Sequence, residues 1–478
     1  MMGKKLVGLE PKAVFEYFEE IASIPHGSWN CGPISQYLVD FADKHHLRSI
    51  RDKANNVIIF KDGSAGYEDH APMILQGHMD MVCQKDEGVD FNFETDPLDL
   101  AVEGDLVFAR GTTLGADDGI AMALFLAVLA DDTIAHPPLE VVFTADEEVG
   151  LIGANAIDVS MLKGRRMLNV DTFREGTFTA GSAGGAYVTV KLPVERAAYE
   201  GQQLRLKIDG LRGGHSAGVV QDNYGNADKA MGELLHNLGK IRLIELSGGT
   251  AGNAVPRTCQ AVLAAEGMDM TRVENACKAL QNKLQTENKE ADASVTFELL
   301  PAVKTRAVTV DDSVTVAALV DHLPNGVQAW ETAFAGLPQT SLNLGIMELK
   351  EDGVNLLIYP RSSINTDRQA LQDKLKRIVE AHGGEYGQYG VFSAWEYREE
   401  SPLRELMCKL WREMYGQEPT VRVVHAGLEG GAFADQLPGL DCISTGPQAY
   451  DVHTTRERME IASMGRFWNY LLELLKAM

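Results

Sequence analysis

The chain is poor in cysteine and lacks any long apolar run. Its six cysteines are scattered through 478 residues and no two form a C-x-x-C pair, so neither a disulfide framework nor a thiolate zinc site is indicated. The most apolar stretch, residues 120–130, is too short to span a bilayer, and no apolar core of signal-peptide length opens the chain. We therefore expect a soluble, cytoplasmic protein with no membrane partner.

Basic side chains are also in the minority. Lysine and arginine number 44 against 68 aspartates and glutamates, which gives a formal charge of −24 and a pI of about 4.9. Binding to a phosphate backbone requires a basic face, so we expect no nucleic-acid partner. The 45% content of hydrophobic residues is typical of a globular protein, and the length predicts two domains or more.

Apolar periodicity predicts strands that alternate with helices at both ends of the chain. Strands are expected at residues 56–60, 73–76, 139–144, 167–170, 420–424 and 441–444, and helices at residues 11–24, 119–129, 149–157, 402–415 and 456–476. This alternation is typical of an α/β fold with a mostly parallel sheet sandwiched by helices.

The middle of the chain has a different texture. Strands at residues 187–192, 204–208, 241–246 and 355–359 and helices at residues 227–238 and 270–285 predict an α+β module. We therefore predict a catalytic domain built from residues 1–185 and 399–478, with an inserted lid domain at residues 186–398. The glycine-rich segment at residues 181–185 would act as a hinge for lid closure over substrate.

A His-x-Asp sequence follows a predicted buried strand at residues 73–76. His78 and Asp80 are separated by one residue, so on an extended backbone both side chains point the same way. Ligands of open α/β sheets bind at the carboxyl ends of the strands. Because a carboxylate can orient and tune an imidazole, this pair is a candidate half of a metal site.

Four further clusters of acidic or imidazole side chains occupy comparable positions. They are Asp117 and Asp118 before a predicted helix, Glu147 and Glu148 after the strand at residues 139–144, Asp171 after the strand at residues 167–170, and His453 before the last helix. Several strand ends of a parallel sheet share one edge, so these groups can converge. Imidazole and carboxylate ligands without thiolate suit zinc, manganese or cobalt in a catalytic site, and five ligands are enough for two ions that share a bridging carboxylate.

The order of these motifs closely resembles that of the di-zinc aminoacylase and carboxypeptidase-type metallopeptidase superfamily, and within it the aminoacyl-histidine dipeptidases. The segments that carry the resemblance are Gln-Gly-His-Met-Asp-Met-Val, Gly-Thr-Thr-Leu-Gly-Ala-Asp-Asp-Gly-Ile-Ala, Gly-Gly-His-Ser-Ala and His-Ala-Gly-Leu-Glu-Gly-Gly. The resemblance implies a metallopeptidase with two Zn²⁺ per subunit, for which Co²⁺ or Mn²⁺ can substitute. It implies broad hydrolysis of dipeptides with a free amino terminus, Xaa-His included, and it allows a homodimer.

The resemblance also implies a role for each matching residue. The implied metal ligands are His78, Asp117, Glu148, Asp171 and His453, with Asp117 bridging the two ions. Glu147 would be the general base that acts on a metal-bridging hydroxide, and Asp80 would orient His78. Spacing alone allows either Asp117 or Asp118 to bridge, and the residue that does not would interact with the helix N-terminus.

Three further residues are candidates for substrate binding. His215 matches the lid histidine of the superfamily that stabilises the oxyanion. Arg361 offers a bidentate fork for the substrate's terminal carboxylate, and Glu429 could meet the substrate's amino group. The alternatives are a tripeptidase or an N-acyl-amino-acid deacylase of the same superfamily, or a non-catalytic metal- or peptide-binding relative, which would not need Glu147 as a proton shuttle.

Overall fold

The computed structural model describes residues 5–478, which form two compact units. The first unit comprises the chain up to Ser182 together with Tyr397–Val423 and Leu428–Met478, and the second comprises Ala183–Glu396 and Val424–Gly427. Residues 1–4 lie outside the described residues. They are the start of the predicted catalytic domain and of the segment in which no signal peptide was predicted. The functional division into a catalytic domain and a lid stays a prediction.

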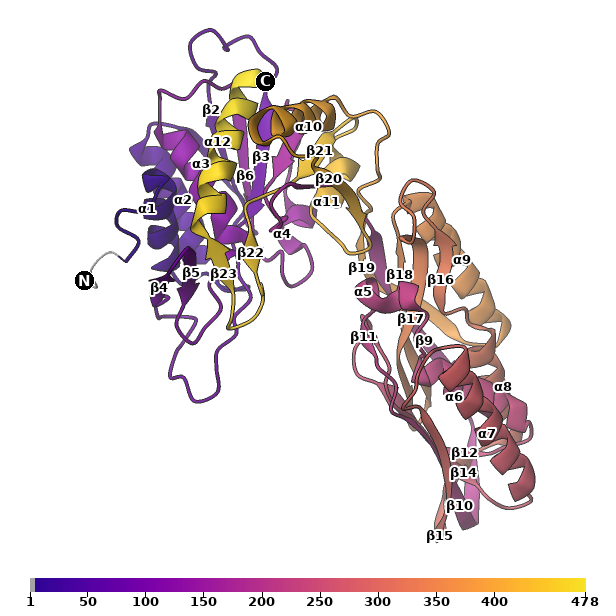
Figure 1. The fold of residues 1–478 in the computed structure, drawn as a ribbon. Helices are drawn as coiled ribbons and strands as arrows, with labels where there is room; N and C mark the ends of the chain where they lie inside the picture. Colours follow the sequence, from indigo (N-terminus) through magenta and orange to yellow (C-terminus); the bar gives the residue numbers. More distant parts are fainter. Residues whose placement is uncertain (1–4) are drawn as a thin grey trace. The chain divides into compact units, whose positions relative to one another are not determined.

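The first unit is built on an eight-stranded sheet (Figure 1). In spatial order its strands are β1 (Arg48–Arg51), β2 (Val57–Lys61), β6 (Leu139–Thr144), β3 (Met73–His78), β7 (Arg166–Asn169), β21 (Asp441–Ser444), β8 (Thr177–Ser182) and β20 (Thr420–Val424). The central neighbours β6, β3, β7 and β21 run parallel, whereas β1, β2 and β6 pair antiparallel and β8 is antiparallel to β21. The predicted α/β class is confirmed, with its parallel strands at the centre of a mixed sheet.

Helices cover this sheet and leave its central strands buried. They are α1 (Lys12–Ala22), α2 (Gly32–Lys44), α3 (Ala116–Ala130), α4 (Ile152–Ala156), α10 (Pro402–Tyr415), α11 (Gly430–Gln436) and α12 (Ile461–Ala477). Every residue of β3 and of β6 is buried, as expected for parallel strands covered on both faces. Helix α3 is buried along nearly its whole length and packs on β3 and α1, so its first turn is held rigidly at the edge where β3 and β6 end. None of the helices in the described part of the chain is both long and apolar enough to cross a membrane.

The start of the predicted helix at residues 456–476 was wrong. Arg458–Glu460 form strand β23, and the helix begins only at Ile461. This strand belongs to a small sheet with β22 (Ala449–Tyr450), β5 (Leu106–Ala109) and β4 (Leu100–Glu103). Pairing with β5, about 350 positions earlier in the chain, overrides the local helical pattern.

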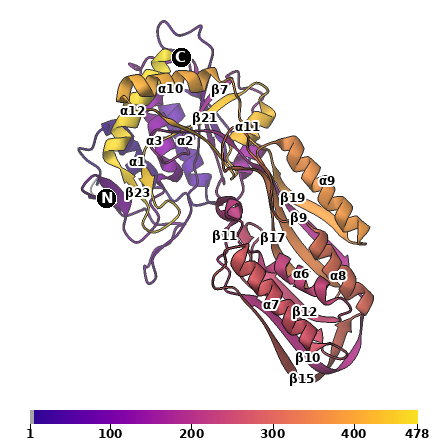
Figure 2. The same ribbon diagram turned by 45° about the vertical axis from the view of Figure 1, so that its right-hand side comes forward.

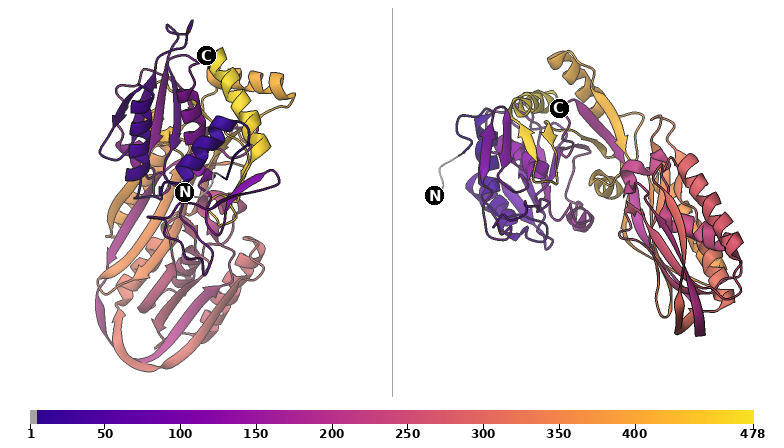
Figure 3. Two further views of the ribbon diagram at one scale, coloured as in Figure 1. Left: turned by 90° about the vertical axis from the view of Figure 1, so that its left-hand side faces the viewer. Right: turned by 60° about the horizontal axis from the view of Figure 1, so that its bottom comes forward.

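The second unit contains a nine-stranded antiparallel sheet (Figures 1 and 2). Its strands are, in spatial order, β15 (Ser294–Val308), β10 (Arg196–Asp209), β14 (Cys259–Ala264), β12 (Leu243–Gly249), β17 (Pro338–Leu349), β18 (Gly353–Ser362), β9 (Gly184–Pro193) and β19 (Glu385–Phe392), while β16 (Gly326–Trp330) pairs with β17. Four helices lie on one face of it, as the two views of Figure 3 also show: α6 (Ala227–Leu238), α7 (Met270–Thr286), α8 (Val310–His322) and α9 (Asn365–Ala381). A two-stranded antiparallel sheet of β11 (Gly214–His215) and β13 (Ala254–Val255), the short helix α5 (Ser216–Val219) and the 3₁₀ turn η1 (Val220–Asp222) complete the unit.

Candidate metal centre

His78 is the last residue of the buried strand β3 and has one ring nitrogen already engaged. Its Nδ1 lies 3.0 Å from the backbone oxygen of Asp80, which leaves Nε2 free to face the cluster. Gly77 directly precedes it, where a Cβ would lie 2.4 Å from that of Ala121 and 2.7 Å from an oxygen of Asp118. Glycine therefore lets β3 approach α3 closely and fixes where the imidazole emerges.

The carboxylate of Asp117 lies between two imidazoles. One oxygen is 2.9 Å from Nε2 of His78, and the other is 3.0 Å from Nε2 of His453. Asp118 turns elsewhere, since its oxygens accept from the backbone N–H of His78 at 3.2 Å and from that of Ala121 at 3.4 Å. The geometry thus separates two adjacent aspartates that spacing leaves equivalent.

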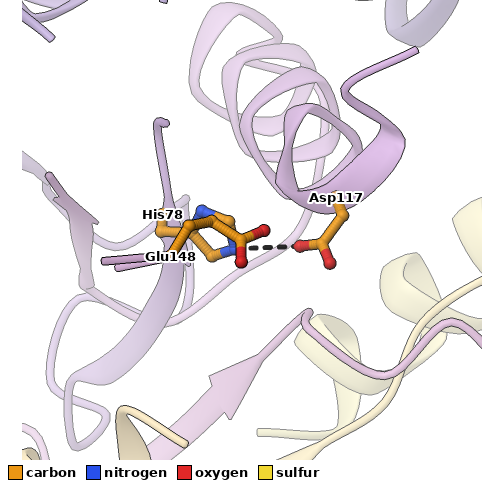
Figure 4. A group of neighbouring side chains, drawn as sticks. All are labelled: His78, Asp117 and Glu148. Atoms are coloured by element: carbon orange, nitrogen blue, oxygen red, sulfur yellow. Dashed lines mark hydrogen bonds and ion pairs between the residues drawn. The ribbon is translucent and has the colours of Figure 1, made fainter. Parts of the chain in front are cut away.

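Glu148 and His453 form the other side of the cluster. Nε2 of His453 lies 2.8 Å from Oε1 of Glu148. Figure 4 shows the Glu148 carboxylate beside the His78 ring, with both facing Asp117 at the first turn of α3. Hydrogen bonds to Asp117 and Glu148 raise the pKa of His453 to about 11. Burial acts to raise the pKa of Asp117, but the two imidazoles hold it at about 2.

Asp80 organises the turn that carries both glutamates. Its carboxylate accepts from the backbone N–H of Glu147 at 2.8 Å, from that of Glu148 at 3.3 Å and from the hydroxyl of Ser28 at 2.8 Å. Nδ1 of His78 is also 3.5 Å from it. A single buried carboxylate therefore connects the strand that carries His78 to the turn that carries Glu147 and Glu148. Its contacts go beyond the predicted role of orienting His78.

Asp171 and Glu429 border the cluster without touching its imidazoles. Burial, followed by the negative charge of Asp117, raises the pKa of Asp171 well above its ordinary value. Glu429 is fully buried, and one of its oxygens accepts from Gln76 at 2.5 Å while the other makes no hydrogen bond of normal geometry within residues 5–478. Burial also raises the pKa of Glu147 well above normal. Several buried carboxyl groups thus lie close together, and a bound cation would stabilise their ionised forms.

The donor set fits a divalent ion such as zinc. One ligand atom from each of His78, Asp117 and Glu148 lies within 4.8 Å of the other two. All are imidazole nitrogens or carboxylate oxygens, which are ligands of zinc in catalytic sites. The contact of His78 Nδ1 with a backbone carbonyl is the orienting contact usual for a metal-ligating histidine.

Glu457 is a site residue that the sequence did not indicate. It is buried and accepts from the backbone N–H groups of Leu114, Gly115 and Asp117 at 2.8, 3.1 and 3.2 Å. Burial and the charge of Asp117 raise its pKa to about 7. Because its partners lie some 340 positions away, no local pattern marks Glu457, although it fixes the backbone from which Asp117 projects.

His215 and Arg361 belong to the second unit. His215 is the last residue of β11 and pairs with Ala254 of β13. Arg361 lies in β18, is only 4% exposed, and places its guanidinium 4.4 Å from the ring centre of Tyr359. Burial lowers its pKa, and no carboxylate in residues 5–478 forms an ion pair with it.

Nearly the whole chain is similar in sequence to known peptidases. Peptidase family M20/M25/M40 matches residues 74–477. The cytosol non-specific dipeptidase of Escherichia coli (strain K12) is 33% identical over 478 residues, or 99% of each chain.

Solved structures agree with the sequence matches. The aminoacylhistidine dipeptidase of Vibrio alginolyticus superposes with a TM-score of 0.90 at 33% identity, covering 100% of this chain and 98% of that one. A tripeptidase from Staphylococcus aureus shares the fold, with a TM-score of 0.58 at 16% identity and 98% coverage of each chain. The resemblance to the aminoacyl-histidine dipeptidases is confirmed, and the protein is a member of peptidase family M20/M25/M40, a hydrolase that acts on peptide bonds.

Proposed function

We propose that the protein is a metallo-dipeptidase that hydrolyses dipeptides with a free amino terminus, Xaa-His among them. The observation that carries this proposal is the Asp117 carboxylate, which has an imidazole nitrogen at about 3 Å from each oxygen. Such a carboxylate is suited to bridging two ions. The names of the E. coli and V. alginolyticus relatives support dipeptides, and Xaa-His in particular, as substrates. A cytoplasmic location and a homodimer stay predictions.

The proposed ligands divide into two sets that share Asp117. His78 and Asp171 would complete one ion, and Glu148 and His453 the other, with Zn²⁺ as the proposed metal and Co²⁺ or Mn²⁺ as substitutes. When bound, the pair of ions would acidify a water molecule and polarise the scissile carbonyl. Asp80 and Glu457 would hold the ligand-bearing backbone in place through their N–H contacts.

Glu147 is the proposed general base. It sits beside the ligand Glu148, and its backbone is fixed by Asp80. Burial raises the pKa of its carboxyl group, and the positive charge of bound ions would oppose this shift and favour the carboxylate. A carboxylate in this position would take a proton from water and deliver it to the leaving amine. Arg361 is proposed to hold the substrate's terminal carboxylate, Glu429 its amino group, and His215 the developing oxyanion.

The decisive experiment combines a substrate panel with one substitution. The zinc-loaded enzyme should cleave free dipeptides and leave their N-acetylated forms and tripeptides largely intact. Glu147→Gln should keep its metal content and lose about 10²- to 10⁴-fold in kcat. Asp158→Asn, at an exposed acid of the same unit, is the matched control and should behave as the unsubstituted enzyme.

Two results would overturn the proposal. Cleavage restricted to N-acetylated substrates would indicate a deacylase, and a preference for tripeptides would indicate a tripeptidase. Near-normal turnover by Glu147→Gln would remove Glu147 as the base.

A further inference from the structure

His425 is a buried histidine with one unused ring nitrogen. It lies in the segment Val424–Gly427, which belongs to the second unit. Its side chain is 5% exposed, and its Nε2 is 2.7 Å from the hydroxyl oxygen of Ser341. Nδ1 is also buried and makes no hydrogen bond of normal geometry within residues 5–478, although the backbone carbonyl of Pro338 lies near the ring. A buried polar atom without a partner is destabilising and therefore calls for a ligand or a structural explanation.

The sheet places His425 beside Arg361. Ser341 of β17 is the direct cross-strand partner of Arg361 in β18. Leu342 and Ile358 of these strands pack in the apolar core that the four helices cover. Side chains of a strand alternate between faces, so Ser341 and Arg361 both lie on the face away from the helices. The contact with Ser341 therefore anchors the imidazole next to the guanidinium.

Arg361 and His425 together lack an anion. Nε of Arg361 is buried without a hydrogen-bond partner within residues 5–478, and the guanidinium carbon lies 4.4 Å from the ring centre of Tyr359. Leaving a buried charge unpaired is costly. A ligand carboxylate would supply the missing acceptors, because a guanidinium binds it in a bidentate fork.

His425 is electrically neutral in this setting. Burial, and then the charge of Arg361, lower its pKa to about 3, against the opposing effect of the Pro338 carbonyl. A neutral imidazole has one donor and one acceptor nitrogen. If the Ser341 hydroxyl donates to Nε2, the ring proton is on Nδ1, the nitrogen that makes no hydrogen bond of normal geometry within residues 5–478. A bound anion would select this arrangement.

We propose that His425 is a specificity-determining residue that donates from Nδ1 to the same substrate carboxylate that Arg361 binds. The inference rests on the proposed dipeptidase function and on the role proposed there for Arg361. His425 would be an uncharged hydrogen-bond donor, oriented by Ser341, that recognises the free carboxylate of the substrate without adding positive charge. Substrates that end in a carboxamide would lose the contact.

The test compares a free dipeptide with its carboxamide in the zinc-loaded full-length enzyme. His425→Gln keeps an amide near the Nε2 position but removes the Nδ1 donor, whereas His425→Asn keeps a donor near Nδ1. We expect His425→Gln to lose about 10- to 100-fold in kcat/KM on the free dipeptide, mainly through KM, with little change on the carboxamide. His425→Asn should restore most of the discrimination, and Ser341→Ala, which frees the ring orientation, should weaken it.

The outcomes separate this inference from the function on which it rests. The role of His425 would be overturned if His425→Gln lost the same factor in kcat/KM on both substrates, or if neither His425→Gln nor Ser341→Ala lost activity. The role of Arg361 would still stand in that case, provided that the unsubstituted enzyme prefers the free dipeptide to the carboxamide. An unsubstituted enzyme that cleaves both substrates equally, with Arg361→Met unchanged, would overturn the carboxylate site itself. Thermal melting of each variant confirms that a kinetic loss does not reflect unfolding.

Discussion

Replacing Asp80 by asparagine should weaken metal binding although it leaves every proposed ligand unchanged. The carboxylate accepts three hydrogen bonds, at 2.8, 2.8 and 3.3 Å, from Ser28, Glu147 and Glu148. Asparagine keeps one oxygen and places an N–H group where the second accepted. At least one contact to a charged group is therefore lost, and such a contact contributes about 1.5–3 kcal/mol.

That loss should appear as weaker metal binding. Removing a partner that orients metal ligands typically lowers affinity about 10- to 100-fold, which agrees with the hydrogen-bond figure. Zinc affinity is measured by competition with a chelator, and kcat is measured at saturating zinc. Ser28→Ala is the matched control, because it removes one contact of Asp80 and leaves both backbone contacts. Unchanged zinc affinity and kcat in Asp80→Asn would refute the reasoning.

Three further predictions concern Glu457, His453 and Asp228. Glu457→Gln should lower zinc affinity about 10-fold, because an amide N–H would face the backbone donors that hold Asp117; an affinity equal to that of the unsubstituted enzyme would argue against this role. His453→Ala should retain less zinc per subunit after dialysis, as metal analysis would show, and unchanged stoichiometry would remove it from the ligand set. Asp228 is buried at the start of α6, and burial raises its pKa from 3.8 to about 8 against the opposing contact with the Cys259 thiol. Between these two pH values the folded protein retains a proton that the unfolded chain releases. The free energy of unfolding should therefore fall as the pH rises, by at most about 1.4 kcal/mol per pH unit. Asp228→Asn should flatten that slope in urea unfolding, and equal slopes would contradict the assignment.

Much of the first unit was predictable because its elements have strong local signals. Helix α10 and strands β6, β20 and β21 have the predicted bounds. Strand β6 is an apolar run with a single glutamate, and α10 is an amphipathic stretch that begins with Pro402 after a capping serine. Helix α2 was missed, and β23 was taken for the start of a helix. Strand β23 depends on its pairing with β5, whereas α2 does carry a local helical pattern, with Ile34, Leu38 and Phe41 on one buried face and a proline near its start.

The sequence by itself determined the chemistry that is available. It supplied imidazole and carboxylate groups at strand ends and helix starts, and their order identified the superfamily. Strand direction and alternation are local properties, so the convergence of those ends could be anticipated.

Only the tertiary structure decided which atoms meet. Asp117 and Asp118 are adjacent, yet one carboxylate lies between His78 and His453 while the other accepts backbone N–H groups. That choice depends on the backbone angles at the start of α3, which the packing of the helix on β3 fixes. The contacts of Glu457 with the Asp117 loop likewise join residues about 340 positions apart, and such pairings arise from the folded chain as a whole rather than from any local stretch of it.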